Sequence, residues 1–275
     1  MAQRYVRIQD NSGTIHYGLL QLDHSVLLLS GAPWLGGQAL DTAIAEMDYH
    51  LLAPCLPSKI VAVGRNYQAH AAELGNVVPA EPLLFLKPPS AIAADQQDIV
   101  YPPQSQRVDY EGELAIIIGK ESKHINADQA VNAIWGYTIA NDITARDLQR
   151  QDSQWTRAKG FDGFCPLGPW VVRHLSADAR LQTFVNDETE PRQSSSICDM
   201  VFAPADLIAY ISQIMTLFPG DVILTGTPEG IAPLKVGDTV KVEIEGIGSL
   251  LNQIVAPPED NWLEPETPLP PVELP

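Results

Sequence analysis

The chain has 275 residues and a formal net charge of −17, with 45% hydrophobic and only 19% charged residues. This length allows one large domain, or one large domain with a small one, and the apolar content is sufficient for a full core. Nucleic-acid binding depends on clustered Lys and Arg, so the acidic composition argues against it. No run approaches the roughly 18 apolar residues of a membrane span, and the N-terminus lacks the apolar run of a secretory signal. With three scattered cysteines outside any CxxC pair, we expect a soluble, cytoplasmic protein without a membrane partner.

The first 55 residues are predicted to form a small N-terminal α+β domain. Residues 1–30 alternate apolar and polar side chains, as strands do, and Asn11-Ser12-Gly13 is typical of a hairpin turn. Residues 40–52 have helical spacing, which predicts a helix there. Two prolines, Pro54 and Pro57, flank the joint with the next domain.

Residues 59–255 are predicted to form the main domain, which is mixed and mostly β. Short strand-like runs outnumber helices and do not alternate strictly with them, which argues against a doubly wound sheet. The expected helices are QAHAAELG, with Gly75 at its C-terminal cap, and PADLIAYISQIMTL. Residues 256–275 form a third segment, an acidic tail with seven prolines, to which we assign no chemistry.

Two glutamates, Glu111 and Glu113, begin the apolar run YEGELAIII. On a strand, side chains two residues apart lie on the same face. Two carboxylates at the end of a buried strand repel each other and need a cation or a raised pKa. The alternative is a solvent-facing end of an edge strand, which the spacing alone favours.

Asp142 follows the strand-like run WGYTIAN and is a third candidate carboxylate. It is also a candidate N-cap for a helix beginning in TARDLQ, and taken alone this is the simpler interpretation. Together, Glu111, Glu113 and Asp142 would offer three anionic oxygens to a hard divalent ion, Mg²⁺ or Mn²⁺, and leave coordination positions for a chelating substrate.

His70 and Glu73 are three residues apart on one face of a predicted helix. A histidine oriented by a carboxylate is a general base that can activate water. The alternative is an ordinary surface pair, because this spacing is weak evidence. It does not match the HExxH pattern of zinc proteases.

Three basic residues lie in apolar or Gly/Pro-rich settings: Arg65, Lys87 and Lys159. Most lysines are solvated, but a lysine that ends an apolar strand in an acidic protein is a better than average anion contact. The run at residues 224–230, LTGTPEG, follows a strand and contains Thr227. Its hydroxyls and backbone N–H groups are suited to a carboxylate, although it lacks the spacing of a phosphate-binding P-loop.

In this order, these motifs resemble the fumarylacetoacetate hydrolase family over about residues 59–255. The matching segments are VGRNYQAHAAELG, LFLKPPSAI, VDYEGELAIIIGK, GYTIANDITARDLQ, RAKGFDGFCPLGPWV, RQSSSICDMVF and PGDVILTGTPEGIAPLKVGDTVKVEIEGIGSL. The N-terminal 55 residues resemble the small extra domain of some members. Departures from the family pattern at Gly163, Asp187 and Leu251 leave the substrate preference open.

The resemblance implies a mixed β-sandwich roll with a few short helices, usually a homodimer. It implies Mg²⁺ or Mn²⁺ held by Glu111, Glu113 and Asp142, and a small 2-oxo or 2,4-dioxo acid as substrate. It also implies catalytic roles for His70 and Glu73 on a lid-like helix and for Lys159, and substrate contacts for Arg65, Lys87 and Thr227.

The function predicted first is metal-dependent hydrolysis of a C–C bond in an acylpyruvate or fumarylpyruvate, which gives pyruvate and a carboxylic acid. Water activated by His70 and Glu73 would attack the distal carbonyl, and Lys159 would stabilise the oxyanion. Oxaloacetate decarboxylation and 2-hydroxydienoate isomerisation are alternatives, because both pass through the same enolate. A small-acid binding protein without turnover is a third hypothesis, and a purely structural protein a fourth.

Overall fold

The computed structural model describes residues 3–258, and β-strands dominate its regular structure. This confirms the predicted mixed, mostly β fold class. The tail predicted over residues 256–275 lies almost entirely outside the described residues. No helix within residues 3–258 has the length and apolar character needed to cross a membrane.

Twelve strands form one large sheet that connects the N-terminal segment to the rest of the chain. They are β1 (Arg4–Asp10), β2 (Ile15–Leu20), β3 (Val26–Leu29), β4 (Ala39–Ile44), β5 (Tyr49–Leu52), β6 (Ile60–Gly64), β7 (Leu83–Lys87), β8 (Ile92–Ala93), β11 (Gly112–Ile118), β12 (Ile134–Asn141), β14 (Cys165–Val172) and β17 (Val222–Leu224). Their order is β4-β3-β2-β1-β14-β12-β11-β17-β6-β7, with β5 paired to β1 and β8 to β14.

Five further strands form a second sheet, and two short strands pair separately. The five are β9 (Ile99–Val100), β15 (Arg180–Val185), β16 (Gln193–Ser196), β18 (Thr239–Ile244) and β19 (Gly248–Val255). They follow the order β16-β15-β18-β19-β9. The separate pair consists of β10 (Val108–Asp109) and β13 (Thr144–Ala145).

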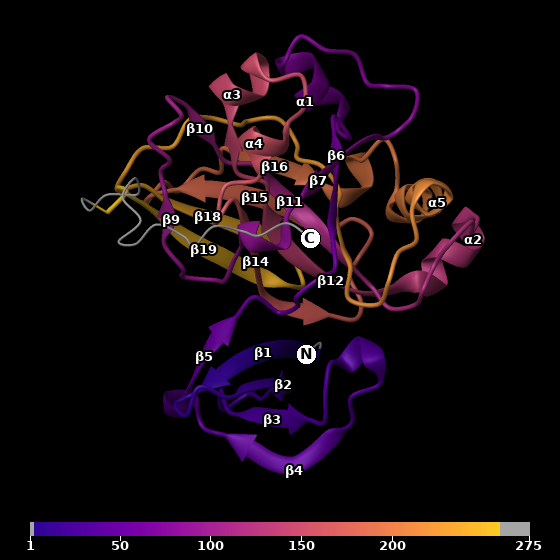
Figure 1. Ribbon diagram of the computed structural model, residues 1–275, viewed down its shortest axis with the longest axis vertical. Coiled ribbons are helices and arrows are strands. Elements are labelled where there is room, and N and C mark those ends of the chain that lie inside the picture. Colours follow the sequence, from indigo (N-terminus) through magenta and orange to yellow (C-terminus); the bar gives the residue numbers. More distant parts are fainter. Residues whose placement is uncertain (1–2, 259–275) are drawn as a thin grey trace, which may run out of the picture.

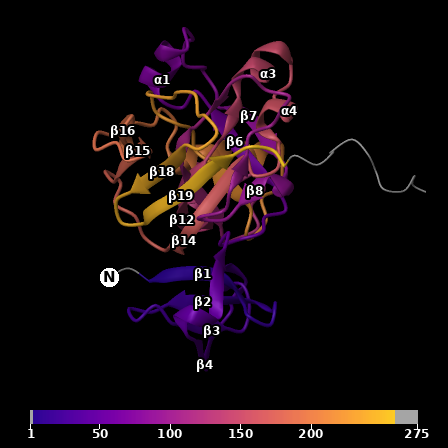
Figure 2. The same ribbon diagram turned by 90° about the vertical axis from the view of Figure 1, so that its left-hand side faces the viewer.

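The helices are short, and the longest one packs on a face of the large sheet. They are α1 (Gln68–Glu73), α2 (Ala127–Ala130), α3 (Arg146–Gln151), α4 (Thr156–Lys159) and α5 (Pro204–Ile214), with 3₁₀ turns at Pro33–Leu35, Glu46–Asp48, Pro89–Ala91, Val131–Ala133 and Ile197–Asp199. In both ribbon views, α1 and α3 lie at the end of the molecule remote from β1–β5 (Figures 1 and 2). This places the candidate catalytic helix away from the N-terminal strands.

The N-terminal strands β1–β5 form a distinct unit at one end of the molecule (Figure 1). β1 pairs with β14, so backbone hydrogen bonds continue from this unit into the large sheet. Aromatic packing strengthens the junction, because the Trp34 ring lies edge-on to Trp135, with 5.6 Å between the ring centroids. Trp34 is buried and belongs to the same apolar cluster as strands of the main sheet.

Strand β11 is buried along its whole length of seven residues. It is sandwiched between two antiparallel neighbours, β12 and β17. A strand buried on both faces requires apolar side chains in succession, which is the role of its isoleucines. Its N-terminal end is therefore held in a fixed position, and the candidate carboxylates are at that end.

The structure confirms the hairpin predicted at Asn11-Ser12-Gly13 and corrects one predicted helix. β1 and β2 pair around a turn with Gly13 at φ 87°, and β15 and β16 pair beyond Asn186 at φ 57°. Residues 40–52, predicted to be helical, instead form β4, a 3₁₀ turn and β5. Their backbone groups pair with β3 and β1, and Met47 stays 88% exposed, so sheet pairing outweighed the helical spacing.

Candidate metal centre and active site

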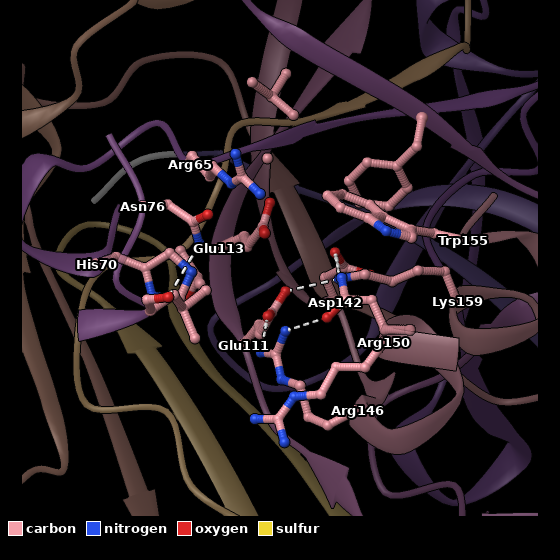
Figure 3. A pocket seen from close by; sticks show the side chains of 16 residues that line it. Arg65, His70, Asn76, Glu111, Glu113, Asp142, Arg146, Arg150, Trp155 and Lys159 are labelled. Carbon is pink, nitrogen blue, oxygen red and sulfur yellow. Dashed lines mark hydrogen bonds and ion pairs between the residues drawn. The ribbon is translucent and has the colours of Figure 1, made fainter. Parts of the chain in front are cut away.

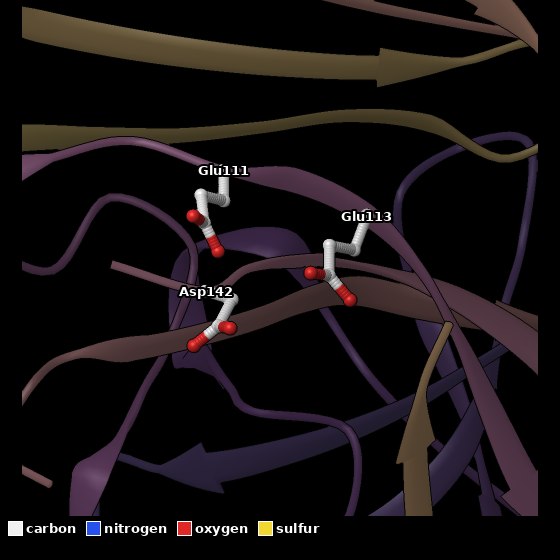
Figure 4. A group of neighbouring side chains, drawn as sticks. All are labelled: Glu111, Glu113 and Asp142. Atoms are coloured by element: carbon white, nitrogen blue, oxygen red, sulfur yellow. The ribbon is translucent and has the colours of Figure 1, made fainter. Parts of the chain in front are cut away.

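Two adjacent strand ends bring the three predicted carboxylates together. Glu111 directly precedes β11 and Asp142 directly follows β12, and these strands pair with Gly112 opposite Asn141. The backbone N–H of Asp142 donates to the carbonyl of Glu111 at 2.8 Å. Oxygens of Glu111, Glu113 and Asp142 all lie within 4.8 Å of one another (Figure 4). They are the candidate metal ligands.

These residues are neither at the solvent-facing end of an edge strand nor, for Asp142, at a helix N-cap. Glu111 is 5% exposed, and Glu113 and Asp142 are each 1% exposed, so none is at a solvent-facing edge. Helix α3 begins at Arg146 with Ala145 at its N-cap, so Asp142 does not cap it. A buried charge requires a partner, and the three carboxylates differ in the partners they have.

Glu111 and Asp142 are surrounded by cations. Lys159, at the end of α4, donates to Glu111 at 2.8 Å and also binds Asp142. Arg146 binds Glu111 and donates to Asp109 at 2.9 Å. Burial opposes ionisation of Glu111, but Arg146 and Lys159 outweigh it and hold the pKa of Glu111 below its usual range.

Among residues 3–258, no cation forms an ion pair with Glu113. Its carboxylate accepts one hydrogen bond, from the backbone N–H of Gly226 at 2.7 Å. Burial, and then the charges of Asp142 and Glu111, raise the pKa of Glu113 well above its usual range. Glu113 is therefore left without an ion-pair partner within the described residues, and the three side chains offer only oxygen donors. Both properties fit a hard divalent ion such as Mg²⁺ or Mn²⁺.

A cavity of about 280 Å³ opens above the carboxylates (Figure 3). It is lined by all three of them and by four other residues predicted from the sequence: Arg65, His70, Lys159 and Thr227. The volume is near the lower end for small-molecule sites. The cavity therefore suits a small acid and unites most of the predicted site residues.

His70 and Glu73 extend from α1 beside this cavity. The two side chains approach to 3.3 Å between His70 Nδ1 and Glu73 Oε2. Glu73 also accepts a hydrogen bond at 3.1 Å from the backbone N–H of Gly230, in the loop that carries Thr227. His70 lines the cavity and Glu73 supports it from behind, so the arrangement matches a base with its orienting carboxylate.

Thr227 is held by a buried hydrogen-bond network. Its Oγ1 donates to the carbonyl of Gly112 at 2.8 Å and accepts from Gln193 Nε2 at 2.7 Å. The amide oxygen of Gln193 accepts from the N–H of Gly112 at 3.0 Å. Gly112 lies between two candidate ligands, so this network joins the Thr227 loop to the carboxylates.

Lys87 lies behind Asp142 rather than on the wall of the cavity. It is fully buried, donates to Asp142 at 2.6 Å and to the carbonyl of Ile143 at 3.3 Å, and is not among the residues that line the cavity. This geometry suits a lysine that orients Asp142 from behind. A direct substrate contact by Lys87 stays a prediction that these contacts do not support.

Sequence analysis missed several residues that line the cavity: Asn76, Phe85, Arg146, Gln149, Arg150 and Trp155. Arg146 had a usable signal, because it begins a helix four residues after Asp142. No sequence signal identified Trp155 or Arg150 as site residues, since an aromatic or basic residue in a polar segment is usually a surface residue.

The fold and the cavity together define a mostly β enzyme-like protein with a buried carboxylate centre. The family model for the C-terminal domain of fumarylacetoacetate (FAA) hydrolase matches residues 59–255, and an Rv2993c-like N-terminal model matches residues 3–54. The chain belongs to the fumarylacetoacetate hydrolase family. Members of this family include isomerases, tautomerases and hydrolases.

Three relatives illustrate this range. The structure of 5-carboxymethyl-2-hydroxymuconate delta-isomerase from Mycobacterium smegmatis is 43% identical, with a TM-score of 0.86 over 92% of this chain and 100% of that one. Human mitochondrial oxaloacetate tautomerase FAHD2B is 45% identical over 74% of this chain and 69% of its own. Fumarylpyruvate hydrolase from Pseudomonas aeruginosa, in complex with Mn²⁺ and pyruvate, is 34% identical, with a TM-score of 0.69 over 76% of this chain and 92% of that one.

Proposed function

We propose that this protein is a divalent-metal-dependent hydrolase that cleaves a C–C bond in a small 2,4-dioxo acid of the acylpyruvate or fumarylpyruvate type. The observation that carries the proposal is the pairing of His70 with Glu73 on the wall of the cavity that holds the three carboxylates. Glu111, Glu113 and Asp142 would hold Mg²⁺ or Mn²⁺. When bound, the ion would act as a Lewis acid toward the 2-oxo oxygen of the substrate.

The side chains of this chain account for the remaining steps. His70 takes a proton from water, and the hydroxide oxygen bonds to the carbonyl carbon C4 of the substrate. The C3–C4 bond then breaks, its electron pair stays on C3, and a proton added at C3 gives pyruvate. The other product is a carboxylic acid. Glu73 orients His70, and Lys159 offers positive charge to the oxygen that becomes negative.

A second candidate function is tautomerisation or isomerisation of a 2-oxo acid. It is favoured by the names of two relatives, an oxaloacetate tautomerase and a 5-carboxymethyl-2-hydroxymuconate delta-isomerase. This reaction needs proton transfer at C3 but no attacking water. His70 would then donate and accept that proton.

One experiment separates the two candidates. Pyruvate release from acetylpyruvate is measured with Mg²⁺ and with EDTA, for the wild type, His70→Asn and the exposed control His174→Asn. Metal-dependent release that falls about 10²–10⁴-fold only in His70→Asn supports the hydrolase. Absence of cleavage with accelerated keto–enol interconversion of oxaloacetate supports the second candidate instead. Absence of both reactions contradicts both.

A further inference from the structure

The segment at residues 192–202, RQSSSICDMVF, lies within the family match but takes no part in the proposed reaction. It contains β16, which forms one edge of the second sheet. Gln193, the first residue of β16, is fully buried despite this edge position. A buried amide needs hydrogen-bond partners within the protein, because water does not reach it. The partners of Gln193 therefore show what this part of the second sheet supports.

Gln193 binds the Thr227 loop, which we define as residues 226–230. The Nε2 group of Gln193 donates to Thr227 Oγ1 at 2.7 Å and to the carbonyl of Pro228 at 2.9 Å. Its amide oxygen accepts from the N–H of Gly112 at 3.0 Å. A carbonyl only accepts and an N–H only donates, so these two backbone groups fix the orientation of the amide. Gln193 thus joins the middle of the loop to the first residue of β11.

The first residue of this loop, Gly226, supports a candidate metal ligand. Its backbone N–H donates to Glu113 at 2.7 Å, and Glu113 has no ion-pair partner among residues 3–258. Gly226 has φ 94°, and a Cβ there would lie 2.8 Å from the Cβ of Asn66, so the backbone packs closely at this point. The position of the Glu113 carboxylate therefore depends on where this end of the loop lies.

The last residue of the loop, Gly230, supports the candidate base. Its backbone N–H donates to Glu73 at 3.1 Å, and Glu73 in turn approaches His70 to 3.3 Å. Gly230 has φ 96° and lies against Arg192, because a Cβ on Gly230 would come within 1.9 Å of the Arg192 carbonyl oxygen. The two ends of the loop therefore support different parts of the site, and the chain at the start of β16 contacts the loop at its middle and at this end.

The middle of the loop depends on Gln193. Within residues 3–258, Gln193 is the only side chain that donates hydrogen bonds to Thr227 and Pro228. Thr227 itself donates to the carbonyl of Gly112 at 2.8 Å, so Gln193 and Thr227 together bind both backbone groups of Gly112. The members of such a closed network constrain one another, and removal of one leaves its partners buried and unpaired. Without Gln193, the loop would lose its only side-chain donor between its two ends.

We propose that Gln193 is a positioning residue of the active site, although it does not line the cavity. It holds the loop in a position where one end binds Glu113 and the other end binds Glu73. One buried amide on the second sheet thereby aligns a metal ligand with the carboxylate that orients the base. This role rests on the proposed function, which makes Glu113 a metal ligand and Glu73 the partner of the base. Loss of a residue that supports a metal ligand typically weakens metal binding by about 10–100-fold, and Gln193 acts through the loop, so we expect the lower end of this range.

The test compares Gln193→Met with a matched control, Asn252→Leu. Asn252 is also a buried amide on the second sheet, and it donates to the carbonyls of Ala94 at 2.9 Å and Gln97 at 2.8 Å, away from the cavity. Both changes remove buried hydrogen bonds, so both should lower the midpoint of denaturant unfolding. Calorimetric titration without substrate should show Mn²⁺ binding about tenfold weaker in Gln193→Met and unchanged in Asn252→Leu. Thr227→Val removes the hydroxyl that Gln193 binds and should weaken Mn²⁺ binding in the same direction, so it decides the test if Gln193→Met does not fold.

Hydrogen exchange followed by mass spectrometry gives a second measurement that does not require the metal. In Gln193→Met, but not in Asn252→Leu, the backbone amides of residues 226–230 should exchange roughly two- to tenfold faster, as for the loss of one hydrogen bond. Mn²⁺ affinity equal to that of the wild type in the folded variants of Gln193 and Thr227 would overturn the proposal. If the wild type binds no Mn²⁺ while exchange is faster only in Gln193→Met, the proposed metal centre fails and the role of Gln193 in holding the loop stands. If exchange is also unchanged, both fail.

Discussion

The floor and the rim of the cavity are built in different ways. At the floor, formed by Glu111, Glu113, Asp142, Arg146 and Lys159, the charged groups are almost fully buried and linked by ion pairs, and Glu113 belongs to β11, which is buried along its whole length. At the entrance of the cavity, which we call the rim, Arg65, Arg150 and Trp155 line the cavity and Glu73 lies behind His70; all four are half-buried or exposed. A buried charge network allows little variation, whereas exposed side chains can change at small cost. We therefore expect substitutions at the floor to have larger effects than substitutions at the rim.

The largest effect is expected from Glu111→Gln at the floor. Replacing one of three anionic ligands with a neutral amide should weaken Mn²⁺ binding by more than the roughly 10–100-fold typical of residues that only support a ligand. Calorimetric titration with Mn²⁺ measures this, and activity should be lost in parallel. Glu229→Gln is a suitable control, because Glu229 is exposed in the Thr227 loop. Unchanged Mn²⁺ affinity in Glu111→Gln would contradict the proposal that Glu111 is a metal ligand.

An intermediate effect is expected from Lys87→Met. The change removes one of the two lysines that bind Asp142, and losing a hydrogen bond to a charged group should lower the free energy of unfolding by about 1.5–3 kcal/mol. Saturating Mn²⁺ should reduce the loss, because the ion restores positive charge beside Asp142. Denaturant unfolding with EDTA and with Mn²⁺ measures both values, and the exposed Lys120→Met serves as control. An equal loss in both conditions would argue that Lys87 acts independently of the metal site.

The smallest effect is expected from Glu73→Gln at the rim. It is the same chemical change as Glu111→Gln, but Glu73 is exposed and the amide oxygen can still accept from Gly230. The free energy of unfolding should therefore change by less than about 0.5 kcal/mol. The rate of hydrolysis should fall less than in His70→Asn, because only the orientation of the base is disturbed. A loss of stability as large as that of Lys87→Met would contradict the distinction between floor and rim.

Much of the floor could be predicted from sequence, because its carboxylates lie at or near the ends of buried strands. Glu111 and Glu113 precede a run of isoleucines, and an acid placed there has few alternatives once the strand is buried. The family resemblance then supplied what spacing alone left open, including the choice of Asp142 over a helix cap. The cations around these acids were harder to assign, since Lys87 supports a ligand from behind the cavity.

The rim could be predicted only in part, because its residues come together through tertiary structure. Arg65 carried a signal from its motif, but the charges around Arg150 depend on how α3 packs beside Trp155. The helix predicted over residues 40–52 failed for a related reason, since pairing with β3 and β1 decided its conformation. Local pattern predicts an element well where the segment is buried and less well where its partners are distant in sequence.

The register between β11 and β12 determines whether the candidate metal ligands meet. Gly112 lies opposite Asn141, and this alone sets Asp142 beside Glu111. Because side chains alternate across a strand, one residue inserted within β11 would turn Glu113 to the opposite face. The connection between the two strands, residues 119–133, has no strand alternation to preserve, but Ala130 and Ala133 pack in the core beside α5. A residue inserted within β11 should therefore abolish function through the site itself, whereas one inserted in the connection should act first on stability.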